Sequence, residues 1–593
     1  MSEYLGCKVF ASLYRDSVVL MQVSQQLEAL PGVRRAAAMM GTPQNKDLLR
    51  AAALLPAEGE QAGANDLLVC VQAESATALA AALQAAAQQL SAPPAASSSG
   101  EATAPRTLEG ALRHLPDANL ACISVPGAYA AYEARKALRH GLNVFLFSDH
   151  VPLAAEVALK DLAAQQGVLL MGPDCGTALL NGLPLGFANQ VPRGPVGLVS
   201  ASGTGLQHVL CLLAQQGIGV SQAIGVGGRD LHAQVGGRSM RAALRVLAAD
   251  PQTHVVVLIS KPPDAAVARE LAHEAAQLGK PCVWAVLGAP APPQATLYRV
   301  ATLAGAAQAA AALARGEPVT KEDLRVSLAL PPELVAARAC LHPSQRAIRG
   351  LYTGGTLAYE ALWLLRRWLG RVGSNLDDRS EAAPAAEHLV LDLGAETYTG
   401  GRPHPIIDPR PRQQLLRELA RQPEVAVVLC DVILGWGAHA SPGEALAEAW
   451  QEAQAEARAA GRRLVGIATV CGTPGDPQDL AAQCRVLRAQ GMAVTLNHVE
   501  AVRWAAAIVG AKEAGQTPAP EPAAGEPLPA GLPVATAPAR FAALLAAGPR
   551  VINLGLERFA ASLARFGVPV VHVDWRPPAG GDVRLLRVLE RLQ

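Results

Sequence analysis

The sequence predicts an α/β protein with several doubly wound parallel-sheet domains and a small N-terminal α+β sandwich. Three observations support this. A chain of 593 residues is too long for one hydrophobic core. Short apolar runs alternate with helical patterns along most of its length, as in parallel sheets covered by helices. Half of the residues are hydrophobic but only 4% are aromatic, which fits helices with alanine-rich faces.

Charge and cysteine content argue against several classes of protein. The net charge is +1 and no basic tract stands out, so we expect no nucleic-acid partner. No 18-residue apolar run occurs and the start, MSEYLGCKVF, lacks the pattern of a signal peptide, so we expect a cytoplasmic protein without a membrane partner. The ten cysteines are scattered without a CxxC pair, which favours reduced thiols and no metal site.

Residues 1–90 are expected to form the α+β sandwich, of the ACT or ferredoxin-like kind. Its expected order is strand, helix, strand, strand, helix, over residues 8–14, 16–30, 32–40, 66–73 and 76–90. The Pro- and Ser-rich stretch 91–106 is expected to be a linker.

The rest of the chain divides into larger α/β units. Apolar strands at 120–126, 143–148, 168–173, 196–200, 223–228, 254–260 and 282–288 predict parallel sheets over 107–193 and 194–315. Residues 346–514 repeat the scheme. After a Pro-rich stretch at 515–536, residues 537–593 are expected to form a small C-terminal α/β module.

Two strand–turn–helix segments are nearly alike: GLVSASGTGLQH at 197–208 and GLYTGGTLAYEA at 350–361. Ligands of open parallel sheets bind at the carboxyl ends of the strands, where helix N-termini offer unpaired N–H groups and partial positive charge. One such loop is often only a turn, but two suggest a shared phosphate site. Its expected ligands are Ser200, Ser202, Gly203, Thr204, Gly205, Thr353, Gly354, Gly355 and Thr356.

Three further residues are candidate catalytic groups. Arg229, in GGRD, either clamps an anion or forms a surface ion pair. Lys261 directly follows the strand 254–260, and His404 lies in the irregular, ionisable segment 397–412. Asp431 ends a strand and is expected to cap a helix rather than act as a base. Cys471 would be a nucleophile only with a base nearby.

Residues 171–230, from MGPDCGTALL to VGGRD, resemble the α-subunit of succinyl-CoA synthetase and the NDP-forming acyl-CoA synthetases. In that superfamily GPNC, a VGIVSRSGT-type loop and VGIGGD occur in this order. The resemblance implies a CoA-binding-like Rossmann domain without its Gly-rich loop (107–193), a flavodoxin-like ligase domain (194–315) and a second ligase-like domain (346–514). RGLYTGGTLAYEA, GRPHPIIDP and TVCGTPGDPQ also resemble the FdrA family, along residues 1–593.

The departures from the superfamily concern its phosphate carrier. In those enzymes both glycine loops point at a phosphohistidine in a GHAGA motif, expected here after the strand 283–288. Residues 289–310 contain no histidine. Lys261 stands where the acidic GEIGG partner of that histidine is expected. No ATP-grasp domain is evident. The resemblance therefore implies an enzyme without a phosphohistidine.

By resemblance, FdrA proteins are implicated as one subunit of oxamate carbamoyltransferase, in purine (allantoin) catabolism. This reaction converts oxalurate and phosphate to carbamoyl phosphate and oxamate. We therefore expect phosphate or carbamoyl phosphate as ligand, CoA only doubtfully, companion subunits and an oligomer. Two alternatives stay open. One is an acyl-CoA synthetase that uses CoA and a nucleotide domain on another chain; the other is a non-catalytic regulatory or scaffold subunit.

Overall fold

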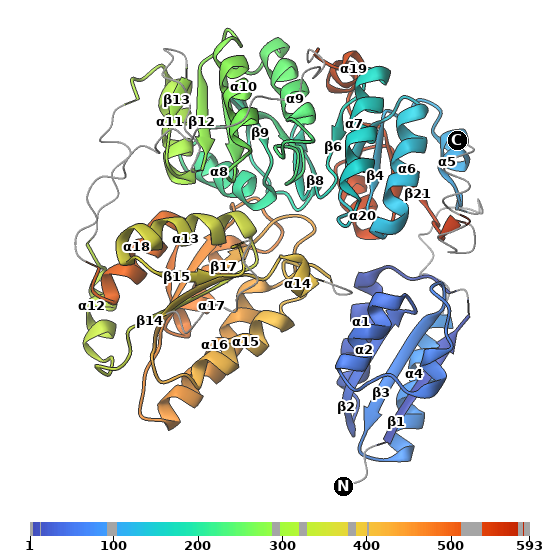
Figure 1. Ribbon diagram of the computed structural model, residues 1–593, viewed down its shortest axis with the longest axis vertical. Helices are drawn as coiled ribbons and strands as arrows, with labels where there is room; N and C mark the ends of the chain where they lie inside the picture. Colours follow the sequence, from blue (N-terminus) through green and yellow to red (C-terminus); the bar gives the residue numbers. More distant parts are fainter. Residues whose placement is uncertain are drawn as a thin grey trace.

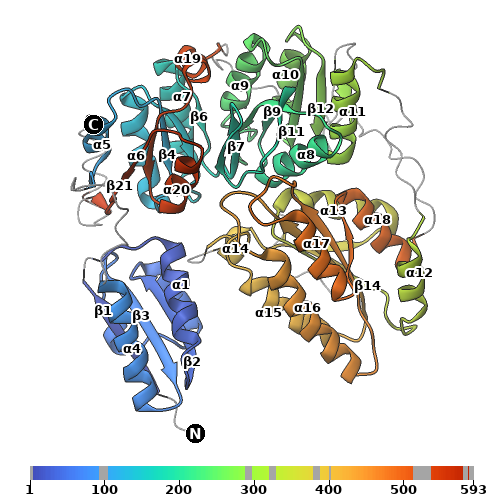
Figure 2. The ribbon, with the colours of Figure 1, turned by 180° about the vertical axis from the view of Figure 1, so that it is seen from behind.

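The computed structural model describes residues 4–11, 13–91, 104–287, 297–319, 329–377, 387–399, 403–511, 536–578 and 585. Four sheets, each with its helices, surround a common centre (Figure 1; seen from behind in Figure 2). Most of the two stretches expected to be linkers, 91–106 and 515–536, lies outside the described residues. No helix in the described part of the chain has the length and apolar character needed to cross a membrane.

The N-terminal unit is a three-stranded antiparallel sheet in the order β1-β3-β2, covered by helices, as the α+β prediction requires. Its elements are β1 (Tyr4–Phe10), α1 (Ser17–Glu28), β2 (Val33–Met40), α2 (Pro43–Ala51), α3 (Ala57–Glu60), β3 (Leu67–Ala73) and α4 (Ala76–Ser91). The first strand ends at Phe10 rather than at Tyr14. Tyr14 instead packs against Trp575, with ring centroids 5.1 Å apart.

The second unit is a parallel sheet in the order β21-β20-β4-β5-β6. Its elements are α5 (Leu108–His114), β4 (Leu120–Ile123), α6 (Gly127–Arg139), β5 (Asn143–Leu146), α7 (Leu153–Gln166), β6 (Leu170–Met171), α19 (Ala539–Ala547), β20 (Val551–Leu554), α20 (Glu557–Arg565) and β21 (Val570–Val573). The segment 537–593 therefore does not form a sheet of its own. The buried strand β4 pairs with β5 along one edge, and the backbone N–H and C=O groups of its other edge also need partners. Strand β20 returns from the far end of the chain and supplies them.

The third unit is a seven-stranded sheet in the order β13-β12-β11-β9-β10-β7-β8. Its elements are β7 (Thr177–Leu180), β8 (Leu183–Gly186), β9 (Arg193–Ser200), α8 (Gly203–Gln215), β10 (Val220–Gly225), α9 (Arg238–Ala249), β11 (Val255–Ser260), α10 (Ala265–Ala276), β12 (Cys282–Val286), β13 (Leu297–Arg299) and α11 (Leu303–Arg315). The hairpin β7–β8, placed by the sequence in 107–193, pairs antiparallel with β10 and extends this sheet.

The fourth unit is an all-parallel sheet in the order β15-β16-β14-β17-β18-β19. Its elements are α12 (Pro332–Ala339), β14 (Ala347–Tyr352), α13 (Gly355–Leu369), β15 (Val372–Ser374), β16 (His388–Asp392), α14 (Glu396–Thr399), α15 (Arg410–Ala420), β17 (Val425–Ile433), α16 (Pro442–Ala459), β18 (Val465–Cys471), α17 (Leu480–Ala489), β19 (Ala493–Thr495) and α18 (His498–Ile508).

The third unit holds the others together through apolar contacts on both of its faces. On one face, Leu206 and Leu210 of α8 belong to the same buried cluster as Leu357 and Ala361 of α13. On the other face, Leu244 of α9 shares a cluster with apolar residues of the second unit, Leu120, Phe145, Phe541 and Val551. Burial of apolar surface is the dominant stabilising contribution, so the relative placement of these three units follows from their shared cores.

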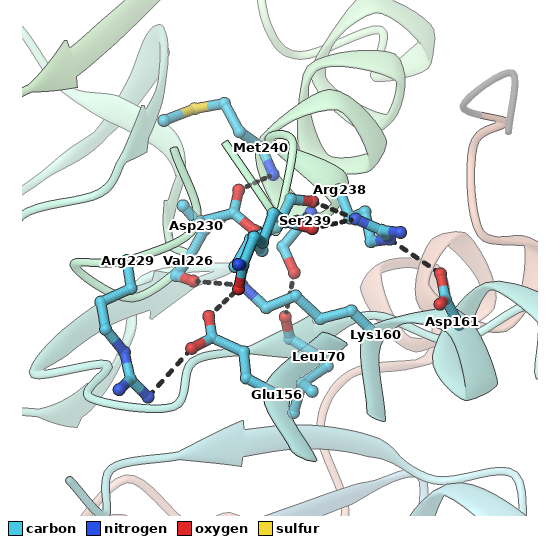
Figure 3. Close-up of polar contacts among 12 residues, drawn as sticks. Glu156, Lys160, Asp161, Leu170, Val226, Arg229, Asp230, Arg238, Ser239 and Met240 are labelled. Atoms are coloured by element: carbon cyan, nitrogen blue, oxygen red, sulfur yellow. Dashed lines mark hydrogen bonds and ion pairs between the residues drawn. The ribbon is translucent and has the colours of Figure 1, made fainter. Parts of the chain in front are cut away.

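A buried charge network also joins the second and third units (Figure 3). The ammonium of Lys160 in α7 lies 3.0 Å from Glu156 Oε1 and 2.5 Å from Asp230 Oδ1. Asp230 also accepts hydrogen bonds from the first backbone N–H groups of α9, from Ser239 at 3.1 Å and Met240 at 2.8 Å. Buried charges persist only when they are paired, so each member of this network depends on the others.

We expect Lys160→Met to destabilise the protein by about 3–5 kcal/mol, because it removes the cation of the buried Asp230 and leaves Glu156 with Arg229 as its remaining cation. The matched control is Asp161→Asn, which breaks the partly exposed 2.7 Å pair with Arg238 and should cost less than about 1 kcal/mol. Urea unfolding of the full chain measures both. Equal effects of the two substitutions would contradict a structural role for the buried network.

Candidate functional site

The two glycine loops predicted from the sequence meet in the structure. Each joins the carboxyl end of a central strand, β9 or β14, to the start of a long helix, α8 or α13. Ser202 Oγ and Thr356 Oγ1 lie 2.5 Å apart across the interface. A Cβ on Gly354 would lie 2.8–2.9 Å from the side chain of Thr204, so this approach requires glycine. The N-termini of α8 and α13 therefore face each other.

Both loops line a central, open cavity of about 990 Å³, to which all four units contribute residues. Six of the nine expected phosphate ligands line it: Ser202, Gly203, Thr204, Thr353, Gly355 and Thr356. Lys261 and His404 line it as well. The N-terminal unit contributes residues such as Tyr14 and Arg15. The sequence thus located the cavity, although not its depth or its N-terminal wall.

In the first loop, part of the polar chemistry is used internally. Ser200 Oγ donates to the carbonyl of Ser202 at 2.7 Å and accepts from its N–H at 3.0 Å. Ser202 Oγ caps α8 by accepting from the Gly205 N–H at 3.0 Å. Ser200 and Gly205 are therefore structural rather than exposed to the cavity, contrary to expectation. The N–H groups of Gly203 and Thr204 find no acceptor among the described residues, as at an open helix start.

In the second loop, a carboxylate of the protein already occupies part of the expected anion site. Asp431, at the end of β17, accepts from the N–H groups of Thr353 at 2.8 Å and Gly354 at 2.7 Å, and from Thr353 Oγ1 at 2.9 Å. Arg412 lies 3.2 Å from this carboxylate. The N–H groups of Thr353 and Gly354 are thus not available to a ligand, although the sequence predicted both residues as phosphate ligands. Asp431 caps the loop, as expected, and leaves Gly355 and Thr356 at the cavity.

Lys261 is placed beside the second loop. Its Nζ lies 3.3 Å from the position that a Cβ on Gly355 would occupy, and Asp392 Oδ2 borders the same position. No carboxylate of the described residues forms an ion pair with Lys261, although its charge acts on two of them. Burial raises the pKa of Asp392, and Lys261 partly opposes this shift. Lys261 therefore places a cation beside the start of α13.

Asp174 is a further acidic group that lines the cavity. Desolvation, aided by the charge of Asp149, raises its pKa to about 7, while Lys261 and Arg229 act in the opposite direction. Its backbone is left-handed, with φ of 56°. Non-glycine residues held in this conformation concentrate at functional sites. Asp174 is exposed to the solvent of the cavity, which moderates the desolvation, so its pKa is raised toward neutral pH.

His404 supplies a neutral donor to the cavity. Its Nδ1 accepts from the Ile406 N–H at 3.2 Å, which leaves the proton of the neutral ring on Nε2. Burial lowers its pKa to about 4. The ring lies beside Phe187, with centroids 5.6 Å apart, and close to Gly394 in the loop after β16. At neutral pH His404 therefore presents an N–H group without positive charge.

Arg229 and Cys471 do not belong to the cavity. Arg229 forms an ion pair of 3.0 Å with the buried Glu156 (Figure 3). It also donates to the carbonyl of Val151 at 2.6 Å. Arg229 thus pairs with a buried carboxylate rather than with a surface one, and it does not line the cavity. Cys471 is fully buried, with its Sγ 3.8 Å from Cys211 Sγ, and is not placed as a nucleophile.

The sequence missed a polar contact between α8 and the fourth unit. Gln207 Nε2 donates to Asn189 Oδ1 at 3.1 Å and to the Leu434 carbonyl at 3.3 Å. Asn189 Nδ2 in turn donates to Asp476 at 2.7 Å. The sequence offered two signals for these residues. Gln207 directly follows SGTGL, and Asp392 lies in the apolar run LVLDLG at 389–394. Asn189 and Asp476 lie in loops, where no periodic pattern points to them.

The charge state of Asp174 predicts how anion binding depends on pH. As the pH rises through 7, Asp174 loses its proton and adds a negative charge near Lys261. We expect the affinity for sulfate, whose charge is constant in this range, to fall about 2–10-fold between pH 6 and pH 8. Asp174→Asn should remove this dependence, and Asn tolerates the left-handed backbone. Titration calorimetry measures both; an equal pH dependence in the variant would contradict the assignment.

Comparison with protein families identifies three matching family models. Residues 1–106 match the AllF heavy metal-associated domain, residues 193–323 the succinyl-CoA ligase like flavodoxin domain, and residues 351–508 the CoA-ligase domain. One solved structure with a similar chain is the apo dinucleotide-forming acetyl-coenzyme A synthetase 1 of Ca. Korarchaeum cryptofilum. The two are 16% identical, 66% of this chain and 83% of that chain are covered, and the TM-score is 0.25.

Two curated relatives differ in how much of the chain they match. The α-2 subunit of the mitochondrial ADP-forming succinate–CoA ligase of Trichomonas vaginalis is 30% identical over 185 residues, which is 30% of this chain and 59% of that subunit. The uncharacterized protein YahF of Escherichia coli K12 is 41% identical over 487 residues, covering 81% of this chain and 93% of YahF. The chain belongs to the same family as YahF, within the succinyl-CoA synthetase-like superfamily.

Proposed function

We propose that this protein binds phosphate between its two glycine loops and catalyses carbamoyl transfer to it, as an FdrA-type subunit of oxamate carbamoyltransferase. The observation that supports this most directly is the 2.5 Å contact between Ser202 and Thr356. It brings two helix N-termini, each with partial positive charge, to one cavity beside Lys261. This arrangement suits a small, multiply charged anion.

The proposed phosphate site uses groups to which the described residues offer no hydrogen-bond or ion-pair partner. Phosphate oxygens would accept from the N–H groups of Gly203 and Thr204 on α8, and of Gly355 and Thr356 on α13. Lys261 would supply the full positive charge that two helix dipoles alone lack. Asp431 and Asp392 border the second loop. Phosphate can therefore bind only to those N–H groups of the loop that these carboxylates do not already hold.

The chemistry follows from the neutral groups around this site. A phosphate oxygen attacks the carbamoyl carbon of oxalurate, and the C–N bond to the oxamate portion then breaks. The phosphate proton is transferred to the departing nitrogen, so that carbamoyl phosphate and oxamate are formed. The Nε2–H of His404 can donate to the oxygen that gains charge in the tetrahedral intermediate. Asp174, with a pKa of about 7, suits the proton transfer.

An acyl-CoA synthetase is the second candidate, because the relative from Trichomonas vaginalis is named a succinate–CoA ligase subunit. Such an enzyme would form an acyl phosphate and pass its phosphoryl group through a protein residue. The two candidates share the phosphate site and differ in this covalent step. Companion subunits are part of both proposals, since that relative is itself named as a subunit.

Replacement of Lys261 tests the phosphate site. We expect Lys261→Ala to weaken phosphate binding at least about tenfold, because it removes the full charge beside both helix starts. Lys8→Ala removes the same charge from an exposed strand of the N-terminal unit and should leave binding unchanged. Calorimetry with inorganic phosphate measures the affinities, and phosphorolysis of oxalurate with the companion subunits measures activity. Unchanged affinity in Lys261→Ala would rule out this site.

Labelling separates the two candidates. Incubation of the full chain with 32P-labelled ATP, or with labelled acetyl phosphate, should leave no acid-labile phosphate on the protein. The physical reason is that neither ring nitrogen of His404 is a free nucleophile, because Nδ1 accepts from the Ile406 N–H and Nε2 carries the proton. A stable phosphoprotein that disappears on acid treatment would instead favour the acyl-CoA synthetase.

A further inference from the structure

Gln207 lies one helical turn after Gly203 in α8 and lines the same cavity, together with Phe187 and His404. Residues four apart share one face of a helix. Helical side chains also lean toward the N-terminus of their helix. The Gln207 side chain therefore leans back toward the first turn of α8, where the N–H groups of Gly203 and Thr204 are open.

The orientation of the Gln207 amide follows from its partners. Nε2 donates to Asn189 Oδ1 at 3.1 Å and to the Leu434 carbonyl at 3.3 Å. A backbone carbonyl can only accept, so the NH2 group of the amide must be on this side. The carbonyl oxygen Oε1 is consequently on the other side of the amide. The amide cannot be turned over without loss of both hydrogen bonds.

Gln207 Oε1 is a buried acceptor that lacks a partner. The residue is fully buried, and Oε1 has no hydrogen-bond donor among the described residues. A buried acceptor without a donor costs about 1–3 kcal/mol. The attachment of α8 to the fourth unit does not require this atom, because the Asn189–Asp476 contact uses other groups. Because Gln207 lines the cavity, this oxygen is a candidate acceptor for a donor that a ligand brings to the first turn of α8.

Resting on the proposed function, we infer that Gln207 determines the substrate class of the site by accepting a hydrogen bond from the NH2 group of a carbamoyl phosphate. An acyl phosphate carries a carbon group at the same position and would leave Oε1 unpaired. Sites built to hydrogen-bond a substrate N–H discriminate strongly against analogues that lack it. Gln207 would therefore act as a specificity residue, and the glycine loops would bind the phosphate common to both ligands.

Two stable phosphonates test this inference. Phosphonoacetamide and 2-oxopropylphosphonate have the same shape and differ in an NH2 group against a CH3 group. We expect the full chain to bind phosphonoacetamide at least about tenfold more tightly, as measured by titration calorimetry. Gln207→Met should bring the two affinities within about twofold of each other, while the affinity for inorganic phosphate stays within about threefold of that of the unsubstituted protein.

Asp476→Asn serves as the structural control. It weakens the contacts of Asp476 with Asn189 and with the Gln190 N–H, but leaves Gln207 Oε1 in place. This variant should lose thermal stability and keep the preference for the amide. Absence of a preference in the unsubstituted protein would overturn the inference even if Gln207→Met fails to fold. Phosphate binding without a preference overturns only the role of Gln207, whereas absence of phosphate binding overturns the proposed function as well.

Discussion

The structure depends on the close approach of two helix N-termini that carry charge of the same sign. The starts of α8 and α13 meet at the contact between Ser202 and Thr356. Each start has about half a unit of positive charge, so the two repel each other in a buried interface. The protein offsets this with acidic residues at the ends of neighbouring strands, Asp431 on β17 and Asp392 on β16. These carboxylates determine which N–H groups remain open to a ligand.

The order of units along the chain explains why residues of all four units line one cavity. Two complete α/β units, from the hairpin at β7 to α18, separate β6 from β20 of one parallel sheet. Because β20 must pair with β4, the ends of this long insertion are held close together. The shared apolar clusters then orient the inserted units. The N-terminal unit adds a further wall, so residues from distant parts of the chain line one space.

Inside this cavity, the charged groups and the neutral groups have different surroundings, so they can bind different parts of a ligand. Lys261 acts on two carboxyl groups whose pKa values are raised by burial. His404, which lies beside Phe187, and Gln207 are uncharged residues of the same cavity. An anion and an uncharged polar group can thus be held at adjacent positions. A ligand that combines both, such as carbamoyl phosphate, matches this division.

The sequence by itself determined the α/β class, the small N-terminal sandwich and the two glycine loops, because these follow from local periodicity and from glycine, serine and threonine at strand ends. It also singled out Lys261 and His404, which the fold brings to one cavity. It could not show that Asp431 occupies the N–H groups of Thr353 and Gly354, nor that β20 joins β4. It also left Gln207 unrecognised. These contacts join residues about 80 to 430 positions apart, or depend on which face of a helix meets another unit, and only the packed tertiary structure decides them.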